Sequence, residues 1–217
     1  MKQIKTAQEA IAAIKDGDSI MAGGFMCCGQ AYTLVDAILE KGLKNLTLIT
    51  NDAGLPGKGA AKLIEQKRVG KLVASHIGLN PEAGKQMNSG EMKVELVPQG
   101  TLAERIRAAG AGLGGVLTPT GIGTAVEEGK QKVTVDGREF LLEKPLSAEY
   151  AFIKAHTVDK YGNAYIAKAE KNFNIVMALA ARTVIVEAEH IVEPGQLDPD
   201  RVTLPGALVH VIVEAKK

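Results

Sequence analysis

The chain has 217 residues, of which 46% are apolar and 24% are charged, and its formal net charge at pH 7 is +1. These values are ordinary for a globular protein. A charge this close to zero gives no reason to expect nucleic acid or an anionic membrane as a general partner. Aromatic residues are scarce, at 4%, which argues against platforms for stacking bases. Glycine is abundant, with 24 residues, and predicts many tight turns or close backbone approaches.

Targeting signals and disulfides are not expected. No apolar run near the N-terminus resembles the core of a signal peptide, and no run reaches the ~18 residues of a membrane span. The only two cysteines, Cys27 and Cys28, are adjacent, which excludes a disulfide framework and fits a reducing cytosol. We therefore expect a cytoplasmic protein without a membrane-spanning segment, folded as a single domain over residues 1–217.

Short apolar strands alternate with helices in the first half of the chain. Thr6 and Glu9 form a capping box that opens a helix, which Asp16-Gly17 ends. A second capping box, Thr101 with Glu104, opens another helix that runs to residue 109. Between them we expect, in chain order, strand 19–22, a glycine loop, helix 32–41, strand 46–50, helix 60–66 and strands 72–76 and 94–97.

This alternation predicts an α/β fold with a mostly parallel sheet and helices on both faces. In such folds ligands bind beyond the carboxyl ends of the strands. We therefore expect the segments that follow the strands to lie together at one rim of the sheet. These segments are residues 23–25, Asn51, 76–80 and Gln99.

The middle of the chain breaks this pattern. Residues 110–115 are rich in glycine, and residues 118–121 form a turn cluster. Asp136-Gly137, flanked by apolar alternation, is the strongest hairpin signal in the chain. Residues 110–145 are therefore predicted to form a glycine- and β-rich insertion. The α/β pattern then resumes with strand 152–155, helix 174–181 and strands 183–187 and 208–213.

The glycine loop at 23–29 matches neither of two common phosphate-binding motifs. Its G-x-x-x-x-G spacing from Gly24 to Gly29 is followed by Gln30-Ala31, where a P-loop needs Lys-Ser/Thr. The G-x-G-x-x-G dinucleotide pattern is also missed. Two interpretations stay open. The segment is a tight strand-to-helix turn, or its bare backbone N–H groups near a helix N-terminus hold an anion or a ligand carbonyl.

Residues that could carry chemistry are few. No metal site is expected, because the chain has no second cysteine pair and no clustered set of histidines. Cys27 and Cys28 are interpreted as small buried residues rather than nucleophiles. His76, at the end of a rim strand, is the histidine of most interest, and His210 falls within an apolar strand. No Gly-x-Ser-x-Gly elbow occurs, so the chain offers binding loops and no evident nucleophile.

The segment that contains the glycine loop has a family resemblance. Residues 16–29 resemble the A-side signature of family I CoA-transferases, the 3-oxoacid and acetate/butyrate–acetoacetate type. That signature ends in Gly-x-Pro, and Ala31 stands here in place of the proline, which should loosen the start of the next helix. Further matches span almost the whole chain, at 51–52, 74–78, 80–82, 98–107, 110–112, 118–121, 128–129 and 171–174.

This resemblance implies the A subunit of a short-chain acyl-CoA:carboxylate CoA-transferase that works in a hetero-oligomer with a separate B subunit. The family's catalytic glutamate lies in a Ser-Glu-Asn-Gly motif on the B side, and that motif does not occur in this chain. The implied reaction is ping-pong covalent catalysis, in which CoA passes from an acyl-CoA to an acid such as acetate, butyrate or acetoacetate. CoA is then a substrate, and no metal or redox cofactor is implied.

The resemblance also implies roles for particular residues. The glutamine of the family's Pro-Gln-Gly motif donates its side-chain amide to the tetrahedral oxyanion, and here that residue is Gln99. The family's proposed CoA-contacting loop on this chain comprises Gly24, Phe25, Met26, Cys27, Cys28, Gly29 and Gln30.

Two alternative functions remain at this stage. The chain could be half of an acyl-CoA hydrolase, in which water replaces the acceptor acid. It could also be a non-catalytic module that senses acyl-CoA or a sugar phosphate and needs no B chain. An assay of thioester loss with and without an acceptor acid separates the first alternative, and a B-type reading frame encoded next door argues against the second.

Overall fold

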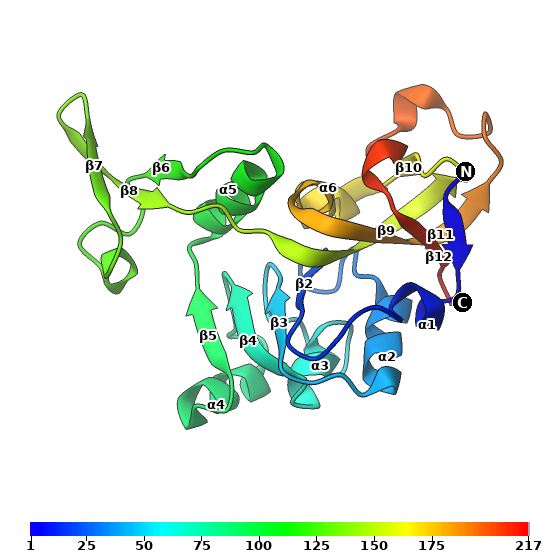
Figure 1. Cartoon of the computed structure of the whole chain (residues 1–217). Coiled ribbons are helices and arrows are strands. Elements are labelled where there is room, and N and C mark those ends of the chain that lie inside the picture. The colour runs from blue at the N-terminus through cyan, green and yellow to red at the C-terminus, as the bar shows by residue number, and fades with distance from the viewer. Residues whose placement is uncertain (217) are drawn as a thin grey trace.

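The computed structural model describes residues 1–216, and most of its strands form one large, mostly parallel sheet (Figure 1). The strand order is β1-β12-β11-β9-β2-β3-β4-β5, and all neighbours along this path are parallel, whereas β10 pairs antiparallel with β9. The strands are β1 (Gln3–Lys5), β2 (Ser19–Ala22), β3 (Leu46–Ile49), β4 (Val69–Ala74), β5 (Lys93–Leu96), β9 (Ala148–Asp159), β10 (Ala164–Tyr165), β11 (Ala181–Val192) and β12 (Val211–Glu214).

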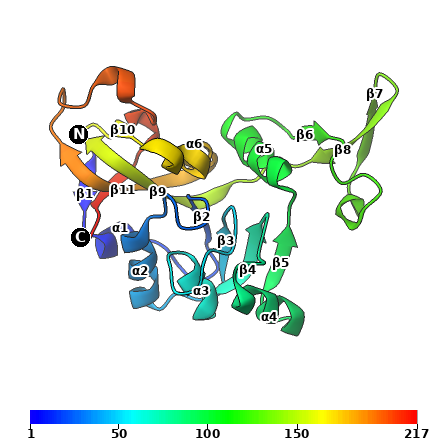
Figure 2. The same cartoon turned by 180° about the vertical axis from the view of Figure 1, so that it is seen from behind.

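Helices cover both faces of this sheet, which confirms the predicted fold class. On one face lie α1 (Ala7–Ala10), α2 (Tyr32–Lys41), α3 (Ala61–Glu65) and α4 (Pro81–Ser89), and on the other lie α5 (Gln99–Gly110) and α6 (Lys171–Ala180) (Figures 1 and 2). Each face has its own buried core. Phe152 of β9 contributes to the first core, and its neighbour Ile153 contributes to the second. Successive side chains of a strand point to opposite faces, so a central strand covered on both sides is apolar throughout.

The predicted insertion forms a separate antiparallel sheet of order β6-β8-β7, which projects beyond α5 in both views (Figures 1 and 2). Its strands are β6 (Val116–Thr118), β7 (Lys132–Val135) and β8 (Arg138–Glu143). The hairpin turn lies at the predicted dipeptide. Asp136 and Gly137 both have positive φ, at 50° and 76°, as a two-residue primed turn requires. Short 3-10 helices complete the chain: η1 (Ala125–Glu127), η2 (Lys168–Glu170), η3 (Pro199–Arg201) and η4 (Gly206–Leu208).

Helix lengths bear on membrane insertion. Within residues 1–216 no helix is both long and apolar enough to cross a bilayer.

The first helix is shorter than predicted. The Thr6–Glu9 capping box is present, yet α1 ends at Ala10 rather than near Asp16. The reason is a tertiary contact. The ammonium group of Lys41, at the end of α2, donates hydrogen bonds to the carbonyl groups that follow α1 in the chain. Its Nζ lies 3.2, 2.8 and 2.6 Å from the carbonyl oxygens of Ile11, Ala12 and Ile14. Those carbonyls are satisfied without further helical turns.

The second predicted capping box is wrong. Helix α5 begins at Gln99 with Pro98 as its N-cap, so Thr101 lies inside the first turn. The Thr101 hydroxyl is buried and has no hydrogen-bond partner among the described residues. Proline restricts φ to the value observed here, −51°, and so fixes the N-cap three residues earlier than the hydroxyl pattern suggested. Gln99 is therefore a helical residue rather than a loop residue.

Helix α4 and the last strand are among the other elements that differ from the sequence predictions. Helix α4 was not predicted, although Asn80 caps it, Pro81 occupies its first turn and Gly90 ends it in the left-handed conformation. The last strand begins at Val211 rather than 208. His210 does not lie in the strand, and its Nδ1 accepts a hydrogen bond of 3.0 Å from the N–H group of Val184.

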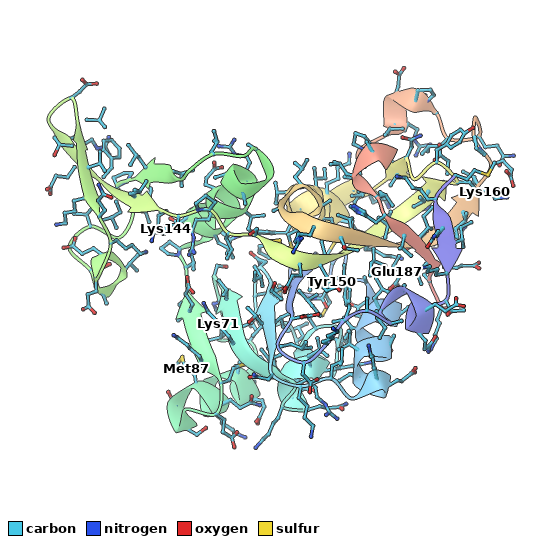
Figure 3. The ribbon with its side chains drawn as sticks, in the orientation of Figure 1. Lys71, Met87, Lys144, Tyr150, Lys160 and Glu187 are labelled. Carbon is cyan, nitrogen blue, oxygen red and sulfur yellow. The ribbon has the colours of Figure 1, made fainter. Side chains whose placement is uncertain are left out.

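The start of α2 depends on a distant residue. Ala31, at the N-cap, has no side-chain acceptor and so makes no side-chain cap. Glu187 of β11, labelled in Figure 3, supplies the acceptor instead. Its Oε2 lies 3.1 Å from the N–H group of Leu34. Burial raises the pKa of Glu187, while the Leu34 N–H group and the charge of Lys154 partly oppose that shift. A carboxylate near a helix N-terminus also interacts favourably with the helix dipole.

This raised pKa predicts a pH-dependent stability difference for Glu187→Gln. A carboxyl group with a pKa above its ordinary value of 4.5 stabilises the fold when protonated, and this contribution is lost as the pH rises through the folded-state pKa. The stability of the natural protein relative to Glu187→Gln should therefore fall as the pH rises above 4.5. Urea unfolding of both proteins at several pH values measures the difference.

Glu189→Gln is the matched control, two residues along the same strand. Lys154 holds the pKa of Glu189 below its ordinary value, so the relative stability of the natural protein should rise with pH in this pair. A Glu187→Gln difference that stays constant from acid to neutral pH would contradict the assignment.

Candidate functional site

Four segments meet at the carboxyl ends of β2 to β5, as the sequence predicted for a parallel sheet. They are the glycine loop after β2, Asn51-Asp52 after β3, Ser75-His76 after β4, and Gln99 after β5. Strand order β2-β3-β4-β5 places these loops side by side. Asp52 and His76 form a parallel bridge beyond the strand ends, which continues the sheet pairing into the rim.

The glycine loop is a tight turn with three residues of positive φ. The N–H groups of Phe25 and Cys28 donate to each other's carbonyl oxygens at 3.0 and 2.9 Å. Met26, at the tip, has a φ of 53°, and Gly24 and Gly29 on either side have values of 118° and 82°. Left-handed φ values favour glycine, so the two flanking glycines are required by the backbone path.

Helix α6 holds this loop against the sheet. Asn174 is fully buried, and its Nδ2 donates to the carbonyl oxygen of Gly29 at 2.8 Å. Asn172 donates in the same way to the carbonyl oxygen of Cys28 at 3.1 Å. A Cβ atom on Gly23 would lie 1.9 Å from Asn174 Oδ1, so glycine is the residue that fits there. The close backbone approach that Gly23 permits is therefore an approach to α6 of the same chain.

The predicted contact residues of the loop differ in accessibility. Gly24, Gly29 and Gln30 are buried, and Phe25 and Cys28 are exposed. The exposed Cys28 corrects the expectation that both cysteines are buried; Cys27 is partly buried. Gln30 is fixed by hydrogen bonds from its Nε2 to the Met26 carbonyl oxygen, at 2.5 Å, and from the Ala60 N–H group to its Oε1, at 3.0 Å. The buried Gln30 side chain therefore stabilises the conformation of the loop.

Gln99 lies exposed at the first turn of α5, and both polar atoms of its side chain form hydrogen bonds. Its Nε2 donates to Asn51 Oδ1 at 2.6 Å, and its Oε1 accepts from the Ser75 hydroxyl at 2.6 Å. A primary amide nitrogen carries two hydrogens, so one N–H group of Gln99 remains for a ligand. The arrangement presents a neutral, oriented donor at the rim.

A buried carboxylate connects Gln99 to the glycine loop. Asp52 Oδ2 accepts from Asn51 Nδ2 at 2.6 Å and from the Met26 N–H group at 2.7 Å. Its Oδ1 accepts from the Gly54 N–H group at 2.8 Å. The loop tip and the Gln99 amide are thus fixed by one continuous chain of hydrogen bonds through Asn51 and Asp52. The sequence placed Asn51 and Gln99 at one rim but did not show their connection through Asp52 to Met26.

A cavity of about 520 Å³ opens beside Cys28, and its wall includes His156, Tyr165, Glu170 and Glu189. Burial raises the pKa of Glu170, whereas the ammonium group of Lys154, 2.9 Å from Glu189, lowers the pKa of that carboxyl group. Sequence reasoning missed this cluster. The histidines that looked scattered are partly gathered here, since the rings of His156 and His190 lie 5.0 Å apart between centroids.

The two cysteines should tolerate replacement by alanine. The bonds that shape the loop use backbone atoms of Phe25 and Cys28, and alanine retains them. In the hetero-oligomer that the family resemblance implies, Cys27→Ala and Cys28→Ala should each keep kcat within about threefold, a change of under ~1 kcal/mol. Steady-state kinetics of both variants test this. A thousandfold drop in a folded variant would show that a thiol takes part in the reaction.

Gly24→Ala should impair the loop more than a matched glycine replacement elsewhere. A Cβ atom on Gly24 would lie 2.6 Å from Gln30 Cγ, in a side chain that is fixed at both ends. Gly17 also has a positive φ, 86°, but a Cβ atom there would meet nothing within 4 Å, so Gly17→Ala carries backbone strain without crowding. Crowding should add about 1–3 kcal/mol of destabilisation in Gly24→Ala, measured by urea unfolding. Equal losses in the two variants would rule out the packing explanation.

Comparisons with known proteins show the family of this chain. Residues 4–215 match the family model described as coenzyme A transferase. The chain is 52% identical over 212 residues to the acetate CoA-transferase subunit alpha of Escherichia coli K12, covering 97% of this chain and 96% of that protein. It is 51% identical over 200 residues to the acetoacetyl-CoA:acetate/butyrate CoA transferase alpha subunit of Clostridium acetobutylicum, covering 92% of each. An acyl-CoA transferase of Escherichia coli O157:H7, solved as a thioester complex with CoA, superposes with a TM-score of 0.88 at 25% identity, over 98% of this chain and 47% of that one.

Proposed function

Because this chain belongs to the coenzyme A transferase family, we propose that it transfers CoA, as the alpha-type subunit, between a short acyl-CoA and an acid such as acetate, butyrate or acetoacetate. The observation that carries the proposal is its 52% identity, over nearly the full length of both proteins, to an acetate CoA-transferase alpha subunit. The family identification made from the sequence is confirmed, as is its assignment as a CoA-transferase subunit.

The proposed partner is a B chain that carries the nucleophilic glutamate. Two observations support it. The Ser-Glu-Asn-Gly motif does not occur in the 217 residues. The chain also spans only 47% of the solved acyl-CoA transferase that it superposes on, while the two relatives compared above are named as alpha subunits. We propose a hetero-oligomer whose active site includes the rim described above.

The proposed reaction proceeds in balanced acyl-transfer steps. The partner's glutamate attacks the thioester carbonyl, the C–S bond breaks, and an acyl-glutamyl anhydride and CoA thiolate form. The thiolate then attacks the glutamyl carbonyl of the anhydride, releasing the first acid and leaving a glutamyl-CoA thioester. The acceptor carboxylate takes over CoA by the reverse of these steps. Each attack passes through a tetrahedral oxyanion that needs a hydrogen-bond donor.

On this chain we assign that donor to Gln99. A neutral amide stabilises developing negative charge without neutralising the attacking carboxylate. The link through Asn51 and Asp52 to Met26 supports the assignment, because it couples Gln99 to the loop proposed to contact CoA. Within that loop, Phe25 and Cys28 are the exposed candidates for side-chain contact with CoA.

We also propose a cytoplasmic location. Both cysteines are free, and Cys28 is exposed, which suits a reducing compartment.

Reconstitution with a B chain tests the function. The two purified chains are mixed, and the transfer of CoA from acetoacetyl-CoA to acetate or butyrate is followed by chromatography of the acyl-CoA products. Formation of the new acyl-CoA in proportion to the acceptor acid supports the proposal. Thioester loss that does not depend on the acceptor acid would instead indicate a hydrolase, and ligand binding without turnover would indicate a sensing module.

A further inference from the structure

Two histidines and a glutamate converge at the carboxyl ends of β9 and β11. The strands pair with Ala155 opposite Ala188 and Thr157 opposite His190, so His156 and Glu189 are cross-strand neighbours. One ligand atom each from His156, Glu189 and His190 lies within 4.8 Å of the others. These residues come from segments more than 30 positions apart in the sequence, and the roles assigned above to the glycine loop and Gln99 do not use them.

Two of these three side chains are each oriented by a contact with another residue. His156 Nδ1 lies 2.8 Å from the Thr157 hydroxyl, and Glu189 Oε1 lies 2.9 Å from Lys154 Nζ. The atoms left over, His156 Nε2 and Glu189 Oε2, lie 4.0 Å apart. Metal-ligating histidines typically use one ring nitrogen for the metal and the other for such an orienting hydrogen bond. The pair is therefore arranged as it would be beside a cation.

We propose that His156, Glu189 and His190 form a binding site for a divalent first-row transition metal of the zinc type. Two imidazoles and a carboxylate are ligands that suit zinc, cobalt and nickel, whereas magnesium and calcium prefer sites made of oxygen atoms alone. Bonds of about 2.0–2.2 Å require the three atoms to approach one another by about 1 Å. The side chains of His156 and Glu189 are 42% and 40% exposed, so rotation about their own bonds is available for this movement.

The fourth coordination position is accessible. His156 and Glu189 both line the cavity of about 520 Å³ beside Cys28, so water or a small carboxylate can complete the coordination from that side. Three protein ligands with one open position are the usual arrangement of non-structural zinc sites. The inference does not rest on the proposed transferase function, because it concerns binding to this chain alone.

Titration of the full chain with Zn²⁺ at neutral pH, monitored by isothermal titration calorimetry, tests the site. One Zn²⁺ per chain should bind, and His156→Gln and His190→Gln should each weaken binding at least tenfold. Thr157→Val, which removes only the orienting hydroxyl, should weaken binding by about 10- to 100-fold. His76→Gln is the matched control, since His76 is an exposed histidine on another strand end, and it should leave the affinity unchanged.

Cobalt distinguishes this site from the cysteines. The Co²⁺ complex should show no thiolate-to-metal absorption band, and Cys27→Ser/Cys28→Ser should bind Zn²⁺ like the natural chain. Circular dichroism confirms that each variant is folded. The proposal is overturned if Zn²⁺ at millimolar concentration does not bind, if both histidine variants bind as tightly as the natural chain, or if the cobalt spectrum reports sulfur ligands.

Discussion

The purified chain alone is expected to show no CoA transfer above background, and the addition of its B chain is expected to restore full turnover. The physical reason is the missing nucleophile. A neutral amide such as that of Gln99 stabilises an oxyanion but cannot form the acyl anhydride, which requires a carboxylate at the thioester carbonyl. Asp52, the acid between Gln99 and the glycine loop, does not fill this role, since it is buried and already accepts three N–H groups.

The measurement is a transfer assay on each chain separately and on the mixture. Mass spectrometry of the purified chain shows that it is free of the B chain, and a mixture with a B chain whose motif glutamate is replaced by glutamine serves as the control. That mixture should assemble and remain inactive. Appreciable turnover by the chain alone would place the nucleophile here and refute the proposed division of roles.

Gln99→Ala in the reconstituted enzyme is expected to lower kcat by about 10²–10³-fold, or roughly 2.7–4 kcal/mol. The loss should appear mainly in kcat, because the donor matters most once negative charge has developed on the oxygen. The structure supplies the reason for a large effect, since hydrogen bonds to Asn51 and Ser75 hold the amide in one orientation before substrate binds. A preorganised donor avoids the cost of reorientation during the reaction.

Two further variants separate the charge from the position of this side chain. Gln99→Glu should be slower still, because a carboxylate repels the oxyanion. Ser75→Ala removes the hydroxyl at Gln99 Oε1 but leaves the donor, so it should cost only about three- to tenfold, the value of one ordinary hydrogen bond. Circular dichroism and size-exclusion chromatography check folding and assembly. A folded, assembled Gln99→Ala enzyme with kcat within about threefold would leave Gln99 a purely structural role.

Local patterns were sufficient for several elements. Strand β2 and helix α2 lie at the predicted residues, 19–22 and 32–41, because apolar periodicity and glycine boundaries act within one segment. The β7–β8 hairpin follows from Asp136-Gly137, whose backbone conformation is a property of the dipeptide itself. The alternation of strands and helices also predicted that Asn51 and Gln99 lie at a common rim, since parallel strands share the edge at which they end.

The sequence by itself thus determined the α/β class, the hairpin insertion, the family and the absence of the Ser-Glu-Asn-Gly motif. Only the tertiary structure decided the early end of α1 under Lys41, the cap of α2 by Glu187 and the approach of His156 to His190. Glu187 and Leu34 are 153 positions apart, so no local window contains both. Such contacts depend on the order in which distant strands pair, and that order follows from packing two cores against one sheet rather than from the periodicity of any single segment.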